Sequence, residues 1–136
     1  MENLFNFEII SEKEAKLKNP QVLAFVGDAV YSLYVRNFIV LNNEGKSGEL
    51  HKLTTKFVKA KSQSDTIERL LPLFTETENE VFRRGRNYKT QSVAKNSSPQ
   101  EYHRATGFEA VIGYLYLSGQ FERLNKFLTI GVKDED

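Results

Sequence analysis

The sequence predicts an all-α fold in one domain. Helix-capping patterns recur along the chain, apolar residues repeat at helical spacing between them, and strand signals are scarce. The 136 residues suit a single core, and a content of 40% hydrophobic and 27% charged residues is ordinary for a globular chain. We therefore expect one helical domain over residues 1–136, without internal repeats or linkers.

The first two helices begin at recognisable cap signals. Ser11 and Glu14 have the spacing of a capping box that opens a short helix. Asn19, followed by a proline, opens a second helix that runs to about Leu41. Apolar residues on more than one face of this helix predict deep burial. A strand is the alternative over residues 30–40, but the length and the clean cap favour a helix.

The middle of the chain predicts three shorter helices. The first spans residues 48–60, and the second spans 62–71, where a proline stops it. Thr75 and Glu78 form a capping box that opens the third, and Gly85 is expected to close it.

The C-terminal third predicts a loop and two helices. Residues 86–97 are polar, basic and without period, which is typical of a loop. Ser98, a proline and Glu101 then combine three helix-start signals, and the helix they open ends at Gly119 as the C′ residue. A last amphipathic helix follows, and its inward-facing residues are expected to be Phe121, Leu124 and Phe127 or Leu128.

Charge and composition restrict the functional classes. The net charge is only +1, yet six Lys or Arg residues and one acid lie between positions 83 and 104. Such a basic stretch can steer a polyanion to one surface, and a solvated loop is the alternative. The chain has no cysteine, which excludes disulfides and thiolate metal sites. Arg36 and Asn37 interrupt the longest apolar stretch, and no secretory signal is evident, so we expect a cytoplasmic protein without a membrane partner.

Two acids stand inside apolar helical segments. Asp28 lies in LAFVGDAVYSLYV, and Glu109 lies in GFEAVIGYLYL. Isolated buried carboxylates are unfavourable, but two on separate helices could share a divalent cation such as Mg²⁺ or Mn²⁺. That composition is typical of sites that cleave phosphodiesters. Helix capping, or a bond to a buried tyrosine hydroxyl, is the alternative. Gly27 and Gly107 indicate a close backbone approach near each acid, most commonly by a partner helix.

Three motifs, in order, carry a resemblance to a known family. LAFVGDAV resembles the signature helix of the ribonuclease III catalytic domain, GELHKL its following helix, and ATGFEAVIGYLYLSG its second catalytic helix. The segments RRGRNYKTQSVAKN and YHRATGFEA are similar to the Mini-III branch, whose members have the catalytic domain alone. The resemblance covers about Pro20 to Phe127.

The resemblance implies a homodimeric helical bundle that hydrolyses double-stranded RNA with Mg²⁺, leaving 5′-phosphate and 3′-hydroxyl ends. For the Mini-III branch it implies maturation of the large-subunit (23S) ribosomal RNA precursor, and a ribosomal protein helper is a candidate partner. Asp28 and Glu109 fall on the family's catalytic, metal-binding carboxylates. No double-stranded-RNA-binding domain is expected after Asp136.

The chain departs from the usual ribonuclease III pattern at the other acid positions. Ala24 stands one turn before the aspartate and Thr106 stands three residues before the glutamate, so two of the four usual carboxylates are absent. The family has a further acid one turn before position 24, and this chain has Gln21 there. We therefore expect weak metal affinity, with Thr106, Glu49 or water completing the ligand set and His103 as a candidate for positioning.

Without an RNA-binding domain, contact with RNA must come from the catalytic body. Duplex RNA is recognised mainly through its shape, its phosphates and its 2′-hydroxyls. The predicted RNA-binding residues surround the basic loop: Arg83, Arg84, Arg86, Asn87, Lys89 and Lys95.

The resemblance also predicts a dimer seam on the signature helix, formed by Phe25, Val26 and Ala29. A catalytically inactive double-stranded-RNA-binding module and a helical interaction protein are the alternatives to a nuclease.

Overall fold

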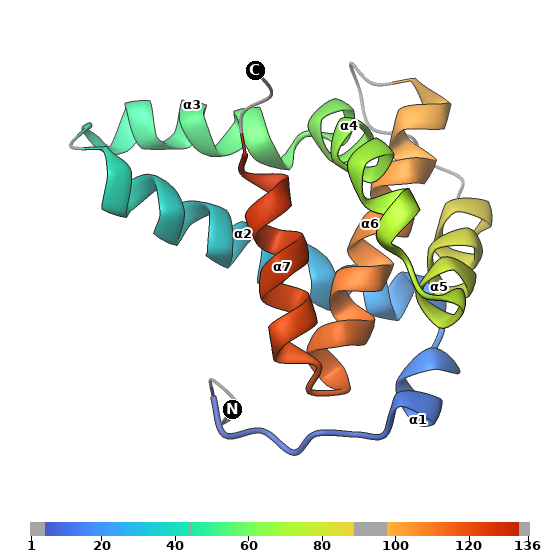
Figure 1. The fold of residues 1–136 in the computed structure, drawn as a ribbon. Helices are drawn as coiled ribbons and strands as arrows, with labels where there is room; N and C mark the ends of the chain where they lie inside the picture. The colour runs from blue at the N-terminus through green and yellow to red at the C-terminus, as the bar shows by residue number, and fades with distance from the viewer. Residues whose placement is uncertain (1–4, 44, 89–97, 134–136) are drawn as a thin grey trace.

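Helix α6 lies at the centre of the fold, and α1, α2, α4, α5 and α7 pack against it (Figure 1). In this computed structural model, the described residues are 5–43, 45–88 and 98–133. The elements follow in the order α1 (Glu12–Lys16), α2 (Pro20–Asn42), α3 (Ser47–Val58), α4 (Ala60–Leu70), η1 (Leu71–Leu73), α5 (Glu76–Asn87), α6 (Pro99–Leu117) and α7 (Phe121–Gly131). The described residues form no strand, so the all-α prediction is confirmed, and residues 30–40 are helical.

Most predicted helix ends are confirmed by the hydrogen bonds at the caps. Thr75 with Glu78, and Ser98 with Glu101, form complete capping boxes at the starts of α5 and α6. Gly119 follows the end of α6 with a φ of +72°, a left-handed conformation that favours glycine. These ends were predictable because a cap depends on residues three or four positions away.

Gly85 does not close a helix, contrary to the prediction. Helix α5 continues through it to Asn87. A β-carbon on Gly85 would lie 2.9 Å from the Cα of Gly107 on α6, so this glycine lets two helices approach closely.

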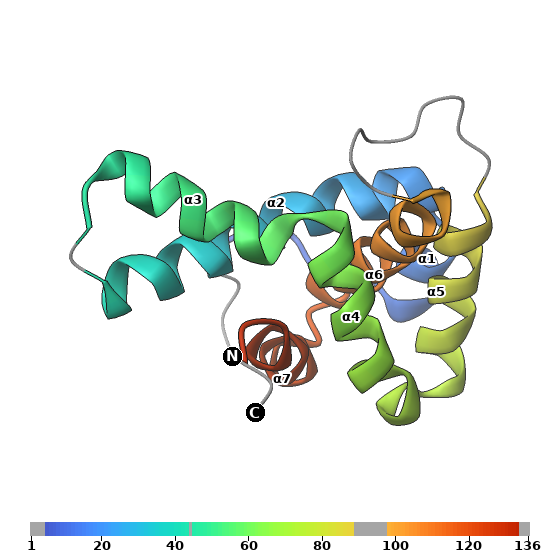
Figure 2. The ribbon, with the colours of Figure 1, turned by 90° about the horizontal axis from the view of Figure 1, so that it is seen from above.

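Helices α2 and α3 form a hairpin that projects from the body (Figure 2). Leu23, Tyr31 and other apolar residues of α2 are buried against the core, but Phe25 is 79% exposed and Leu41 is 75% exposed. The prediction that several faces of α2 are deeply buried was therefore wrong for the single chain. One face of α2 is covered, and another is an exposed apolar stripe.

Helix α2 also bears on the expectation about membranes. By length and composition it would suffice to cross a membrane, so the expectation that Arg36 and Asn37 exclude such a stretch was wrong. In this fold α2 packs along α6 and α3, which accounts for part of its apolar content, and the exposed stripe accounts for the rest.

Candidate active site

The backbones of α2 and α6 touch where the helices cross. A β-carbon on Gly27 would lie 1.8 Å from the carbonyl oxygen of Glu109, and one on Gly113 would lie 2.0 Å from the carbonyl oxygen of Leu23. Real side chains cannot be accommodated at such distances, so glycine is required on both sides of the crossing. This crossing places Asp28, the neighbour of Gly27, beside Glu109.

The carboxyl groups of Asp28 and Glu109 are in hydrogen-bonding contact. Glu109 is half-buried and Asp28 lies on the exposed side of α2, so the buried setting that the sequence predicted for both acids is only partly present at Glu109 and absent at Asp28. The buried hydroxyl of Tyr31, three residues after Asp28, donates to the carbonyl oxygen of Gly131 and not to either acid. The two acids therefore contact each other, and the alternative of a tyrosine partner for them fails at this position.

Burial raises the pKa of Glu109 to about 8. The negative charge of Asp28 and the hydrogen bond to it also contribute to this rise, and a hydrogen bond from Gln63 opposes it. At neutral pH Glu109 therefore tends to keep its proton and donate it to Asp28. When both carboxyl groups are ionised, their adjacent negative charges favour the binding of a cation.

Gln63 is a member of this site that the sequence reasoning missed. Its side chain is 1% exposed, and its Nε2 donates to Oε2 of Glu109 at 3.3 Å. The signal was present: Gln63 shares the buried face of α4 with Ile67 and Leu70, at spacings of four and seven residues. A polar residue on an apolar helix face indicates a buried polar partner.

The pair fits a divalent cation with few protein ligands. In the described part of the chain, no third His, Cys, Asp or Glu joins Asp28 and Glu109 in a metal-binding group. Mg²⁺ typically takes one or two carboxylates and keeps several waters, so two carboxylates are sufficient. Thr106 lies one turn before Glu109, and its hydroxyl donates to the carbonyl of Tyr102.

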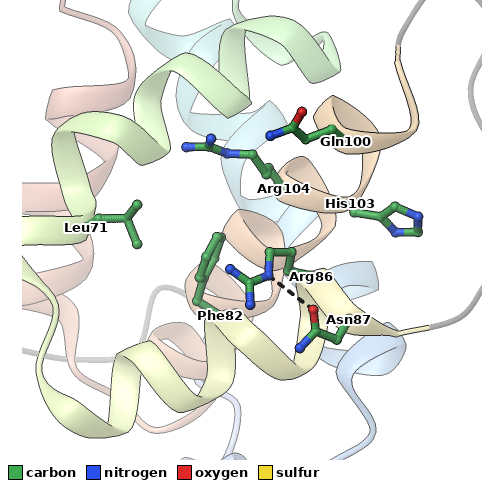
Figure 3. A pocket seen from close by; sticks show the side chains of 7 residues that line it. All are labelled: Leu71, Phe82, Arg86, Asn87, Gln100, His103 and Arg104. Carbon is green, nitrogen blue, oxygen red and sulfur yellow. Dashed lines mark hydrogen bonds between the residues drawn. The ribbon is translucent and has the colours of Figure 1, made fainter.

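Two predicted supporting residues lie elsewhere. Glu49 lies in the first turn of α3, at the tip of the projecting hairpin (Figure 1). Its side chain lies over Gly45, because a β-carbon on Gly45 would be 2.6 Å from Oε2 of Glu49. His103 borders a hollow between α4, α5 and α6, and its ring points away from that hollow (Figure 3). Neither residue joins the carboxylate pair, because each sits on a different part of the helical framework.

The predicted RNA-binding residues separate into different environments. Arg83 is exposed. Arg84 donates to the backbone carbonyls of Lys16 and Lys18, so it ties α5 to the segment between α1 and α2. Arg86 and Asn87 border the hollow next to His103. Lys89 and Lys95 lie outside the described residues.

The predicted dimer seam is on the free surface of the chain. Phe25 and Ala29 are exposed, and Val26 is half-buried. Phe25 and Ala29 are one helical turn apart, beside Asp28.

Known proteins share both the sequence and the fold. The ribonuclease III domain matches residues 21–120. A Mini-ribonuclease 3 from Thermoanaerobacter sp. is 46% identical over 130 residues, which cover 96% of this chain and 92% of the relative. A Mini-ribonuclease 3 from Staphylococcus aureus is 45% identical over 125 residues, which cover 88% and 93%.

A crystal structure of a Fusobacterium nucleatum protein matches this fold with a TM-score of 0.76 at 30% identity, covering 84% of this chain and 91% of that one. Together with the paired acids on α2 and α6, these similarities show that the chain belongs to the ribonuclease III family and, within it, to the branch of the Mini-ribonuclease 3 proteins.

Proposed function

We propose that this ribonuclease is an endonuclease that hydrolyses double-stranded RNA with Mg²⁺, or with Mn²⁺ in its place, leaving 5′-phosphate and 3′-hydroxyl ends. The observation that carries the proposal is the contact between the carboxyl groups of Asp28 and Glu109 at the α2–α6 crossing. Two acids at hydrogen-bonding distance repel each other when both are ionised, and a shared divalent cation removes that repulsion.

Each residue of the site has a separate task. Asp28 and Glu109 would hold the ion, which supplies Lewis-acid stabilisation of the charge that develops on the phosphate. Gln63 holds one oxygen of Glu109 through its amide, so the carboxylate keeps a fixed orientation. Asp28 is exposed, so a phosphate of a bulky duplex can reach the pair from solvent.

A homodimer would match the two strands of the substrate. One carboxylate pair in each chain can cut one strand. Val22, Phe25 and Ala29 form an exposed stripe on α2 at spacings of three and four residues, next to Asp28. Burying this stripe against its copy would place two sites near one twofold axis.

The cellular role that we propose is maturation of the 23S ribosomal RNA precursor in the cytoplasm. Membership of the Mini-ribonuclease 3 branch supports a role in RNA processing, and the 23S precursor is the substrate that the resemblance implies. A ribosomal protein is the candidate helper, and no membrane partner is proposed.

A cleavage assay tests the proposed activity. Wild-type protein and Asp28→Asn are incubated with a labelled RNA duplex in Mg²⁺ and in EDTA, and Asp65→Asn serves as the control because Asp65 is an exposed carboxylate of α4. Wild type and control should cut in Mg²⁺ alone, and Asp28→Asn should not cut. Binding without cutting by the wild type would indicate an inactive RNA-binding module instead. If the wild type neither binds nor cuts the duplex, the result would indicate a helical interaction protein.

A further inference from the structure

A hollow of about 330 Å³ lies between the end of α4, the end of α5 and the start of α6 (Figure 3). Leu71 and Phe82 form an apolar wall. Its polar lining consists of two arginines, two amides and a histidine: Arg86, Asn87, Gln100, His103 and Arg104. No lining residue is acidic, so the hollow is suited to an anion.

Arg86 is held in place at the edge of this hollow. Its guanidinium carbon lies 5.5 Å from the centre of the Phe82 ring, in a cation–π contact. Its Nε donates to Oδ1 of Asn87 at 3.2 Å. Within the described part of the chain, its two Nη groups have no acceptor. A fixed guanidinium with two free donors loses little side-chain entropy when it binds a phosphate.

Arg104 is incompletely paired on the opposite side. Its Nη2 forms an ion pair with Glu68, whose side chain is 64% exposed. Its Nε is buried and has no hydrogen-bond partner among the described residues. A buried donor without a hydrogen-bond partner is unfavourable. An oxyanion bound in the hollow would supply an acceptor for this Nε.

Gln100 lies one helical turn before Arg104, and both side chains project toward α4 on the same side of α6 (Figure 3). Arg104 precedes Glu109 by five residues, which corresponds to about 7.5 Å along the helix axis. The same five residues turn about 140° around the axis, so the hollow opens on a different face of α6 from Glu109, and an RNA duplex bound at Glu109 would have to reach it with a phosphate farther along its backbone.

We propose that this hollow binds a backbone phosphate group of the bound RNA duplex, through Arg86 and Arg104, with the amide of Gln100 as a further donor. This inference rests on the proposed function. The described lining holds two guanidinium groups and no carboxylate, and Glu68, which pairs with Arg104, lies outside it. Two such groups match a tetrahedral oxyanion with two acceptor edges. Inorganic phosphate shares this chemistry and serves as a second probe.

Duplex binding in EDTA, where no cutting occurs, tests the assignment. Affinity is measured across a range of salt concentrations for the wild type, Arg86→Gln, Arg104→Gln and Lys126→Gln. Lys126 is an exposed residue of α7, and Lys126→Gln changes the net charge by the same amount as each arginine substitution. Each pocket variant should bind about tenfold more weakly at low salt and show a salt slope smaller by about one. The Lys126→Gln control should keep the wild-type affinity and slope.

A second measurement separates the two sources of phosphate. The NMR signals of the arginine Nε–H groups are followed while inorganic phosphate, and separately the duplex, is added. Both probes should move the signals of Arg86 and Arg104. A response to phosphate alone would overturn the assignment to RNA. Arg104→Lys, which keeps the charge and loses the planar fork, should retain the salt slope but bind more weakly, and thermal melting confirms that each variant is folded.

The outcomes distinguish this inference from the proposed function. If the wild type binds and cuts the duplex while the pocket variants match Lys126→Gln, this inference is wrong and the proposed function stands. If the wild type binds no duplex, both are wrong.

Discussion

The side-chain amide of Gln63 donates a hydrogen bond of 3.3 Å to Oε2 of Glu109, joining α4 to the α2–α6 crossing. An amide N–H stabilises a carboxylate more than it stabilises the neutral acid, so this contact lowers the pKa of Glu109. It opposes the larger effects of burial and of Asp28. Gln63 therefore favours the ionised form of Glu109 that a cation requires.

Gln63→Leu should raise the pKa of Glu109 and weaken Mn²⁺ binding while the fold is kept, since leucine suits the apolar face of α4. The pKa is measured by carboxyl ¹³C NMR in EDTA, and Mn²⁺ affinity is measured by electron paramagnetic resonance. Thr66→Val is the matched control, because it removes another buried hydrogen-bonding group from α4, one that donates to the carbonyl of Ser62. Identical Glu109 titrations in the two variants would show that the amide has no such effect.

Gly27→Ala should separate α2 from α6 and abolish activity together with much of the stability. The new β-carbon would lie 1.8 Å from the carbonyl oxygen of Glu109, and a backbone atom cannot move aside as a side chain can. Gly48→Ala is the control, since nothing lies within 4 Å of its β-carbon on α3, and it should stabilise the helix by about 0.5–1 kcal/mol. Urea unfolding of both variants measures the contrast. A Gly27→Ala protein as stable as the wild type would contradict the crossing described here.

The helix boundaries were predictable from the sequence because their causes are local. Thr75 with Glu78, and Ser98 with Glu101, form caps within four residues, and the glycine at 119 ends α6 by its own conformation. Gly85 was misread for the same reason. Ending a helix at a glycine is a local rule, and it does not consider contacts with a second helix. At position 85 a glycine is needed because Gly107 of α6 packs against it.

The site was only partly predictable. Asp28 and Glu109 were identified because acids are rare in apolar helices, and the structure brings them together. Gln63 was missed because its partner lies 46 residues away in sequence. Glu49 was assigned to the wrong place because its spacing from Asp28 does not reveal that the α2–α3 hairpin extends away from α6.

Glu109→Gln should remove a pH dependence of stability in the metal-free protein. The pKa of Glu109 is raised from 4.5 to about 8 in the folded state, so the folded state binds more protons between these values. Wild-type stability should therefore fall as the pH rises from about 4.5 to 8. At pH 8 in EDTA the variant should be more stable by roughly 2 kcal/mol, a figure reduced for partial solvent screening.

Urea melts of both proteins at pH 5 and pH 8 measure this difference. Adding Mg²⁺ at pH 8 should restore stability to the wild type alone, because the ion binds the folded state through the ionised carboxylate. Parallel stability curves for the two proteins in EDTA would contradict the raised pKa.

Arg123→Met should destabilise the fold by about 3–5 kcal/mol, because it leaves the carboxylate of Glu78 buried without its cation. Glu78 is 2% exposed, and Arg123 binds both of its oxygens, with Nη2 at 2.7 Å from Oε1. Lys61→Met is the control, since Lys61 pairs with Asp65 on the surface and should change stability by less than about 1 kcal/mol. Adding Glu78→Gln to Arg123→Met should recover part of the loss, since the buried charge is then removed. Chemical denaturation of Arg123→Met, Glu78→Gln and the double variant gives the coupling. Equal losses for the arginine and lysine substitutions would show that burial of the α5–α7 ion pair does not set its contribution.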